Sequence, residues 1–327
     1  ATAPPAVVVA QRIAASLGSL DLGRMNDHLV ALTAAGSRDP RHPGHAKAAA
    51  YIREQLDALA YRGWRIESQR TVYQGIPLEN IFATIDPAPG ATAPNGAPQQ
   101  TPPRVGETGW LLLATHYDST ATRTAGWRPS VDPAPGADDN ATGTAALLEI
   151  QRALSDLRSG GWLGQRVVLA FFDGEELFYK GSAAYLATLP RPAPYAAVLN
   201  IDMVGFNPIA DRLDLIWYTN GSAALRDRVV ATNDKYEIGI APLNLQFAAD
   251  GATILDAAPF GLAGIPSVAL VERYGDADAT YPGNPAFHTV NDTPEGVTNR
   301  RLWLKAARLT LATALEMVVR DPRPPPR

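Results

Sequence analysis

The sequence predicts an α/β fold, in the form of a single three-layer α/β/α domain whose mostly parallel central sheet has a mixed edge. Two observations support this prediction. Short apolar runs rich in Val, Leu, Ile and Phe recur from residue 110 onwards, and stretches with helical periodicity separate them. Alternating strands and helices are typical of a parallel sheet that is covered by helices on both faces. A chain of 327 residues, 46% of them apolar, is long enough to build one such core.

The first third of the chain is expected to be helical and then to enter the sheet. Residues 10–32 show a helical period, and a second helix is expected within residues 42–63. Alternating side chains predict strands at residues 64–73 and 80–86. The proline- and glycine-rich segment 87–105 is interpreted as a surface loop within one domain rather than as a linker between two domains.

The remainder of the chain repeats the rhythm of strand and helix. Strands are expected at residues 110–118, 166–173, 196–202, 213–219 and 266–272. Helices are expected at residues 142–157, 182–189, 222–236, 253–262 and 300–319. The predicted organisation is an N-terminal leader or helix at 1–31, one domain at 32–320 and a disordered tail at 321–327.

Composition excludes several classes of function. The mildly acidic net charge of −4 gives no reason to expect nucleic acid or a membrane surface as a partner. No apolar run reaches the roughly 18 residues that a membrane span needs, so neither nucleic acid nor a membrane is predicted as a partner. The chain has no cysteine, which excludes thiolate metal sites and cysteine nucleophiles. Because the sequence starts at Ala1, a removed export signal is one reading, and a periplasmic or secreted location is expected, with a cytoplasmic one possible.

Polar side chains stand at the ends of three predicted strands. His116 and Asp118 follow the first strand of the alternating series, Glu175 and Glu176 follow the second, and Asp202 follows the third. Ligands of open α/β sheets bind beyond the carboxyl ends of the strands, and in a parallel sheet these ends share one edge. One imidazole and four carboxylates are therefore expected to converge.

Two further segments carry residues that could join this cluster. The turn GADDNATG contains Asp138 and Asp139, and the loop NPAFHTVNDT contains His288. Taken alone, the turn would be an ordinary helix N-cap, and adjacent glutamates at a turn are usually solvated. Taken together, carboxylates and imidazoles without a matching Lys or Arg predict a site for Zn, Mn or Co rather than Ca or Mg. The number of ligands suggests two ions that share one carboxylate.

Five motifs in this order, HYD, GADDNATG, FFDGEE, NIDMVG and NPAFHTVNDT, resemble those of a known family. The family is that of the zinc-dependent exopeptidases with a phosphorylase/hydrolase-like architecture. It includes the co-catalytic di-zinc aminopeptidases and, as a divergent branch, the glutaminyl cyclases. The resemblance extends from about residue 32 to the final predicted helix.

The resemblance implies a role for each residue of the cluster. The implied metal ligands are His116, Asp139, Glu176, Asp202 and His288. They would hold two zinc ions, which Co or Mn could replace, with Asp139 as the bridge. Glu175 would stay off the metals as general base, and Asp118 would orient His116. Asp138 is left out of the ligand set.

The implied activity is that of a zinc metallo-aminopeptidase, a hydrolase that removes the N-terminal residue from a peptide with a free N-terminus. A metal-bridged hydroxide would attack the scissile carbonyl while Glu175 acts as general base. The chain departs from the family at Phe287, where many di-zinc relatives have a Tyr that donates to the oxyanion. Tyr281, another group or the zinc itself could replace that donor.

Several alternatives stay open. The chief rival is a mono-zinc glutaminyl cyclase that forms N-terminal pyroglutamate, and a non-catalytic receptor on the same fold is a third. The preferred N-terminal side chain and the oligomeric state are left open. Candidates for the wall of the substrate pocket are Phe247, Phe260, Tyr274 and Tyr281.

Overall fold

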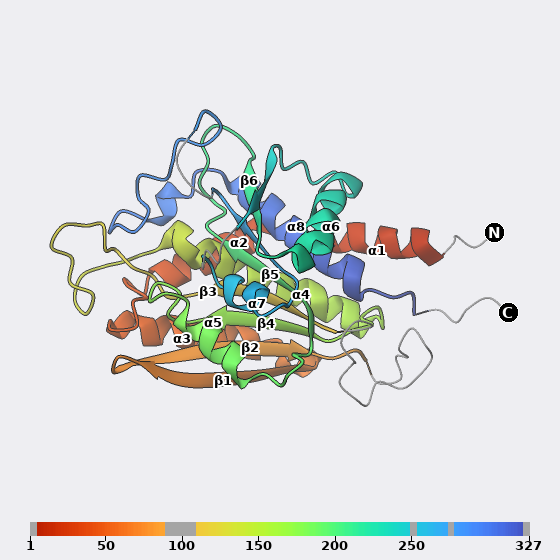
Figure 1. The fold of residues 1–327 in the computed structure, drawn as a ribbon, viewed down its shortest axis with the longest axis horizontal. Coiled ribbons are helices and arrows are strands. Elements are labelled where there is room, and N and C mark those ends of the chain that lie inside the picture. Colours follow the sequence, from red (N-terminus) through yellow and green to blue (C-terminus); the bar gives the residue numbers. More distant parts are fainter. Residues whose placement is uncertain (1–4, 89–108, 249–253, 274–277, 323–327) are drawn as a thin grey trace.

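A computed structural model describes residues 5–88, 109–248, 254–273 and 278–322 of the chain. Its centre is an eight-stranded sheet with the order β1-β2-β4-β3-β5-β8-β6-β7 (Figure 1). Four parallel strands form the middle: β4 (Val167–Phe172), β3 (Trp110–His116), β5 (Tyr195–Asp202) and β8 (Ser267–Val271). The predicted α/β fold class is confirmed.

Antiparallel pairs flank this parallel centre on both sides, not at one edge alone. On one side, β1 (Trp64–Tyr73) and β2 (Ile76–Ile85) form a hairpin, and β2 pairs antiparallel with β4. On the other side, β6 (Leu213–Trp217) is antiparallel to β8 and parallel to β7 (Leu243–Phe247). Strand β7 was not predicted, because this short edge strand is only partly buried and carries little apolar signal.

Helices cover both faces of the sheet, as the three-layer prediction requires. They are α1 (Pro5–Gly18), α2 (Leu22–Thr33), α3 (Pro43–Asp57), α4 (Thr142–Ser159), α5 (Lys180–Thr188), α6 (Ala223–Lys235), α7 (Ala258–Leu262) and α8 (Arg300–Val318). The larger core lies between the sheet and the layer that contains α1 to α4, α6 and α8. A smaller core lies on the opposite face under α5 and α7, which stand in front of the sheet in Figure 1.

The N-terminal segment packs into the larger core. The helical period expected at 10–32 is divided into α1 and α2, and the Asp21 carboxylate caps α2 by accepting a hydrogen bond from the Arg24 N–H. Ile13, Met25 and Leu29 are fully buried, in contact with the core that α4 and α8 share. The predicted domain boundary at residues 31 and 32 stays a prediction.

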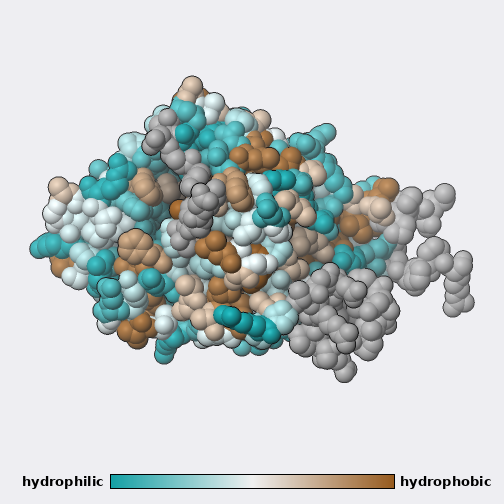
Figure 2. Space-filling model, viewed as in Figure 1, coloured by the Kyte–Doolittle hydropathy of each residue, from teal (hydrophilic) through white to brown (hydrophobic). Residues whose placement is uncertain are grey.

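Among the described helices, none is by itself long and apolar enough to cross a membrane. The bent pair Ala6–Gly18 and Leu22–Thr33 meets such a test by length and composition only. Figure 2 shows hydrophobic residues interspersed among hydrophilic ones over the face that it presents.

Most predicted helix and strand positions agree with the structure to within a few residues. The clearest difference is α7, which was expected at 253–262 and begins at Ala258, one residue before Pro259. Proline favours the first turn of a helix, which explains the later start. Most of the predicted loop 87–105 and most of the predicted tail 321–327 lie outside the described residues.

Candidate metal centre

The carboxyl ends of three adjacent parallel strands deliver the core of the site. His116 is the last residue of β3, and Asp202 is the last residue of β5. Strand β4 lies on the other side of β3, with Phe172 in register with His116, and the turn after it carries Glu175 and Glu176. The strand order therefore explains why residues far apart in the sequence meet at one edge.

Asp139 reaches the same place from the turn that precedes α4. The backbone N–H groups of Asp138 and Asp139 donate to the Asp292 carboxylate at 3.0 and 3.1 Å. The side-chain amide of Asn140 donates to the Thr115 hydroxyl at 3.0 Å and to a backbone carbonyl of β5 at 2.9 Å. These bonds fasten the turn to both strands and hold the Asp139 carboxylate over their ends.

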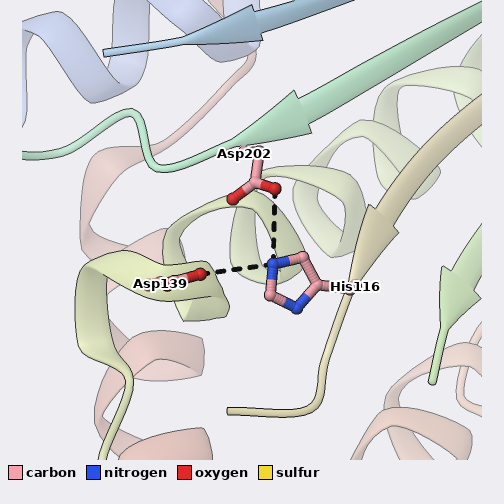
Figure 3. A group of neighbouring side chains, drawn as sticks. All are labelled: His116, Asp139 and Asp202. Atoms are coloured by element: carbon pink, nitrogen blue, oxygen red, sulfur yellow. Dashed lines mark ion pairs between the residues drawn. The ribbon is translucent and has the colours of Figure 1, made fainter. Parts of the chain in front are cut away.

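The first group of possible ligands contains His116, Asp139 and Asp202 (Figure 3). The His116 Nε2 atom lies 3.2 Å from Asp139 Oδ1 and 3.4 Å from Asp202 Oδ2. All three side chains are buried.

The second group contains Asp139, Glu176 and His288. The His288 Nε2 atom lies 3.0 Å from Asp139 Oδ2 and 3.0 Å from Glu176 Oε2. In each group the possible ligand atoms all lie within 4.8 Å of one another. The structure thus brings all five predicted ligands together, and Asp139 belongs to both groups, as expected of a bridge.

Several polar atoms of these groups are buried but make no hydrogen bond to the described residues. Within the described part of the chain, His116 Nε2, Glu176 Oε1 and Asp202 Oδ1 have no hydrogen-bond partner. A buried polar atom without a partner costs about 1–3 kcal/mol, and more when the group is charged. Burial also raises the pKa of Glu176 to about 8 and raises the pKa of Asp202. Divalent cations would satisfy these atoms, and a donor set of imidazole and carboxylate suits zinc.

Asp118 lies behind the first group, where the sequence placed it. Its Oδ1 atom is 3.3 Å from His116 Nδ1, on the side of the ring opposite Nε2. Its carboxylate also accepts the backbone N–H groups of Glu175 at 3.1 Å and Glu176 at 3.2 Å. One carboxylate therefore orients the imidazole and holds the turn that carries both glutamates, in the manner of groups that support metal ligands.

Glu175 belongs to neither group of possible ligands, although it lies beside both. It lines the same cavity as Asp139, Glu176 and Asp202. Burial, together with the charges of Asp202 and Glu176, raises the pKa of Glu175 well above its ordinary value. Bound cations would oppose that shift and favour the ionised form that a general base needs.

The cavity above the site has a volume of about 300 Å³. Its floor is acidic, and most of its remaining walls are apolar. The apolar lining consists of Phe178, Met203, Ile216, Ile254, Leu255, Val271 and Phe287.

Three of the four wall residues proposed from the sequence, Phe247, Phe260 and Tyr281, are not part of this lining. Phe260 is buried in the smaller core, and Phe247 packs on Trp217 at the edge of the sheet. The hydroxyl of Tyr281 donates to Glu272 at 2.5 Å, so Tyr281 does not replace the donor that is absent at Phe287. Tyr274 lies outside the described residues. Sequence reasoning failed here because turns and loops from several strands build the walls.

Phe287 itself lines the cavity, and its ring stacks on His288 with 3.7 Å between ring centroids. The departure from the family pattern therefore lies directly at the site.

Further buried acids lie near the ligands, and of these the sequence analysis named only Asp138, which it left out of the ligand set. Asp138 accepts hydrogen bonds from the Gly205 N–H at 2.9 Å and from the Asn284 amide at 2.8 Å. Next to it, burial and the charge of Asp138 raise the pKa of Glu272 well above its ordinary value. Asp256 is fully buried, and neither of its carboxylate oxygens has a partner among the described residues. No local pattern marks Glu272 or Asp256, because each lies in a segment that reads as ordinary strand or helix.

Residues 98–313 match the family model described as Peptidase family M28. Aminopeptidase YwaD of Bacillus subtilis is 27% identical over 226 residues, which are 65% of this chain and 42% of that protein. A probable leucine aminopeptidase of Arthroderma otae is 29% identical over 214 residues, 63% of this chain and 54% of that protein. The chain thus spans about half the length of the curated relatives that it matches.

Solved structures show the same fold at low sequence identity. The LapA aminopeptidase of Legionella pneumophila aligns with a TM-score of 0.71 at 17% identity, covering 94% of this chain and 74% of that one. A glutaminyl cyclase of Porphyromonas gingivalis aligns with a TM-score of 0.67 at 19% identity, covering 91% and 99%. Both resemblances concern the fold alone.

Proposed function

The chain belongs to peptidase family M28, and from that premise we propose that it is a zinc aminopeptidase that hydrolyses the N-terminal residue from peptides. The observation that carries the proposal is the pair of ligand groups that share Asp139, with Glu175 beside them and outside both. A carboxylate that is close to two cation sites but bound to neither has the position of a general base.

Different residues of this chain would bind the cations and transfer protons. His116, Asp139 and Asp202 would hold one zinc ion, and Asp139, Glu176 and His288 would hold the other. When bound, zinc supplies Lewis acidity, which polarises a carbonyl oxygen and lowers the pKa of a water molecule.

Glu175 accepts a proton from the attacking water and returns it to the departing amine, a role worth about 10²–10⁴-fold in rate. Asp118 keeps Nε2 of His116 pointed at the site through its contact with Nδ1. The acidic floor attracts the ammonium group of the substrate N-terminus, and the apolar walls accept an apolar first side chain.

The second candidate function is formation of pyroglutamate by a glutaminyl cyclase. The observation in its favour is Phe287, which leaves the position beside His288 without a phenol. Two complete ligand groups favour the aminopeptidase, because a cyclase was expected to use one zinc.

Two peptides, Leu-Ala-Phe amide and Gln-Ala-Phe amide, distinguish the two functions. The zinc-loaded protein is incubated with each peptide, and the products are identified by mass spectrometry. We expect free leucine from the first peptide and free glutamine from the second. Loss of ammonia from the Gln peptide, with the chain left intact, would establish the cyclase. A sample treated with a chelator serves as the control and should be inactive towards both peptides.

A further inference from the structure

Arg273 is a wall residue of the cavity that the proposed chemistry does not use. It lies two residues after Val271, the last residue of β8, and both side chains line the cavity. Glu272 between them points the other way, towards Tyr281. Val271 and Arg273 thus face the cavity, whereas the residue between them faces away from it.

The guanidinium is held from the outer side by Asp278. Its Nη1 atom pairs with the Asp278 carboxylate, which also accepts from the Thr280 N–H at 2.7 Å and the Tyr281 N–H at 3.1 Å. The Asp278 side chain is therefore fixed by its own turn. Because it is fixed, it can hold the arginine in one orientation.

Among the described residues, Asp278 is the one hydrogen-bond partner of this guanidinium, through Nη1. An arginine carries five N–H donors in a planar fork. The Arg273 side chain is only 14% exposed, and its Nε atom is buried without a hydrogen-bond partner among the described residues. Donors with this geometry suit a carboxylate, which accepts two parallel hydrogen bonds from one guanidinium.

The charge of Arg273 is opposite to that of the rest of the polar lining. The other charged residues of the described lining are Asp139, Glu175, Glu176 and Asp202, with His288 beside them. These carboxylates attract cations and the substrate ammonium. Arg273 therefore marks a separate place in the same cavity where an anionic part of a ligand can bind.

The spacing along β8 matches the length of a dipeptide. Val271 pairs in register with Asp202, so it stands level with the proposed metal site. Arg273 lies two residues farther on, beyond the bend at Glu272, so the two Cα atoms are at most roughly 7 Å apart at about 3.3–3.6 Å per residue. A dipeptide also spans at most roughly 7 Å, at about 3.3–3.6 Å per residue. A dipeptide with its amine at the acidic floor would present its terminal carboxylate near the guanidinium.

We propose that Arg273 binds a carboxylate that the substrate presents on the residue after the scissile bond. The inference rests on the proposed aminopeptidase function and adds a substrate class, namely dipeptides with a free C-terminus or peptides with an acidic second residue. Both supply a carboxylate on the residue after the scissile bond, and the Asp side-chain carboxylate lies one methylene farther from Cα than a terminal carboxylate does.

The test compares kcat/KM for matched substrates. Leu-Gly and Leu-Gly amide differ only in the terminal carboxylate, whereas Leu-Asp amide and Leu-Asn amide differ only in the second side chain. We expect the wild-type protein to prefer the carboxylate in at least one pair by roughly tenfold to a hundredfold, the worth of a hydrogen bond to a charged group. Equal rates within both pairs would overturn the proposal.

Substitutions of Arg273 test whether this residue causes the preference for the carboxylate-bearing substrate. Arg273→Met should lower kcat/KM for the carboxylate-bearing member of the preferred pair until the ratio within that pair is near one, and Arg273→Lys should retain part of the preference. Arg128→Met, at an exposed arginine outside the cavity, should change nothing. If Arg273→Met slows all substrates equally at unchanged metal content, the residue is structural and the proposal is wrong.

Failure of the subsite and failure of the proposed function give different results. Leu-Gly amide has no free carboxylate, so its hydrolysis tests the aminopeptidase without Arg273. Hydrolysis of all four substrates without any preference would contradict only the proposed role of Arg273. If the zinc-loaded protein hydrolyses none of the four substrates, both the proposed aminopeptidase function and the proposed role of Arg273 are wrong.

Discussion

Asp139 can serve two ligand groups because its two carboxylate oxygens face different histidines. Oδ1 lies 3.2 Å from His116, and Oδ2 lies 3.0 Å from His288. The two adjacent glutamates are separated in a similar way. Glu176 lies against His288, whereas Glu175 lines the cavity without entering either group. Neighbours in the sequence thus have positions that suit different tasks.

Substitution of each glutamate by its amide tests this division. Glu175→Gln should leave the zinc content unchanged and lower kcat by about 10²–10⁴-fold, because an amide cannot accept the proton. Glu176→Gln is the matched control and should lower the zinc content, because it weakens one ligand group. Zinc content is measured by elemental analysis and turnover by leucine release. Loss of metal in Glu175→Gln, with retention of metal in Glu176→Gln, would show that Glu175 is the metal ligand and Glu176 the general base.

At the scale of elements, an ion cluster fixes the start of α8. Asp211, in the segment before β6, accepts from Arg301 Nε and Lys305 Nζ, each at 2.7 Å, and from the Asn299 amide at 3.0 Å. Partial burial alone would raise the pKa of Asp211, but hydrogen bonds from Lys305, Asn299 and Arg301 lower it below the ordinary value of 3.8.

This depressed pKa gives a stability term with a defined pH dependence. The folded state holds the Asp211 proton less tightly than the unfolded state, so the contribution is full above the unfolded pKa of about 4 and is lost as pH falls through the folded pKa. Asp211→Asn should therefore lower the free energy of unfolding by about 1 kcal/mol at neutral pH. The deficit should shrink below about pH 4.

Urea titrations of wild type and variant across this pH range measure the effect. Asp227→Asn is the control, because its side chain is 66% exposed and should have little influence at any pH. A deficit for Asp211→Asn that is constant with pH would contradict the assignment.

Helix α2 tests whether the N-terminal segment folds with the rest of the chain. Leu29 is fully buried in the main core, whereas its neighbour Val30 is 49% exposed. Leu29→Ala should lower the free energy of unfolding by about 2–5 kcal/mol, the usual cost of a cavity in a core. Val30→Ala should cost within about 0.5 kcal/mol. A separate early transition in Leu29→Ala, with the main transition unmoved, would show that α2 belongs to an independent unit.

The sequence was a good guide to these elements where periodicity is strong. The strands that end at His116 and Asp202 read as apolar runs followed by polar residues, and their parallel pairing brought those ends together as expected. Strand β7 lacked such a signal because it is a partly exposed edge strand. Contacts such as that between Asn284 and Asp138 join segments 146 residues apart, so no local pattern reveals them.

In the molecule as a whole, cations bound at the candidate metal centre would stabilise the folded state. Carboxylates from the turn before α4, the turn after β4 and the end of β5 crowd together in one buried place. Without cations, their mutual repulsion and their unsatisfied atoms oppose folding. A ligand that binds only the folded state stabilises it, by about 2.7 kcal/mol per site at a free concentration of 100 times Kd.

Removal of metal should therefore lower the melting temperature by several degrees, and added zinc should restore it. Calorimetry of protein dialysed against a chelator, with and without zinc, measures the shift. Glu176→Gln should show a smaller shift, because one ligand group is weakened. The same melting temperature in all wild-type samples would contradict a metal centre that is coupled to the fold.

The number of zinc ions bound per chain tests most directly whether Asp139 bridges a two-ion site. The protein is saturated with zinc, dialysed to remove loosely held metal and analysed for zinc and protein together. We expect two zinc ions per chain, with both groups of three ligands occupied. One zinc ion per chain would contradict the bridge and favour the cyclase, and none would contradict the metal centre altogether.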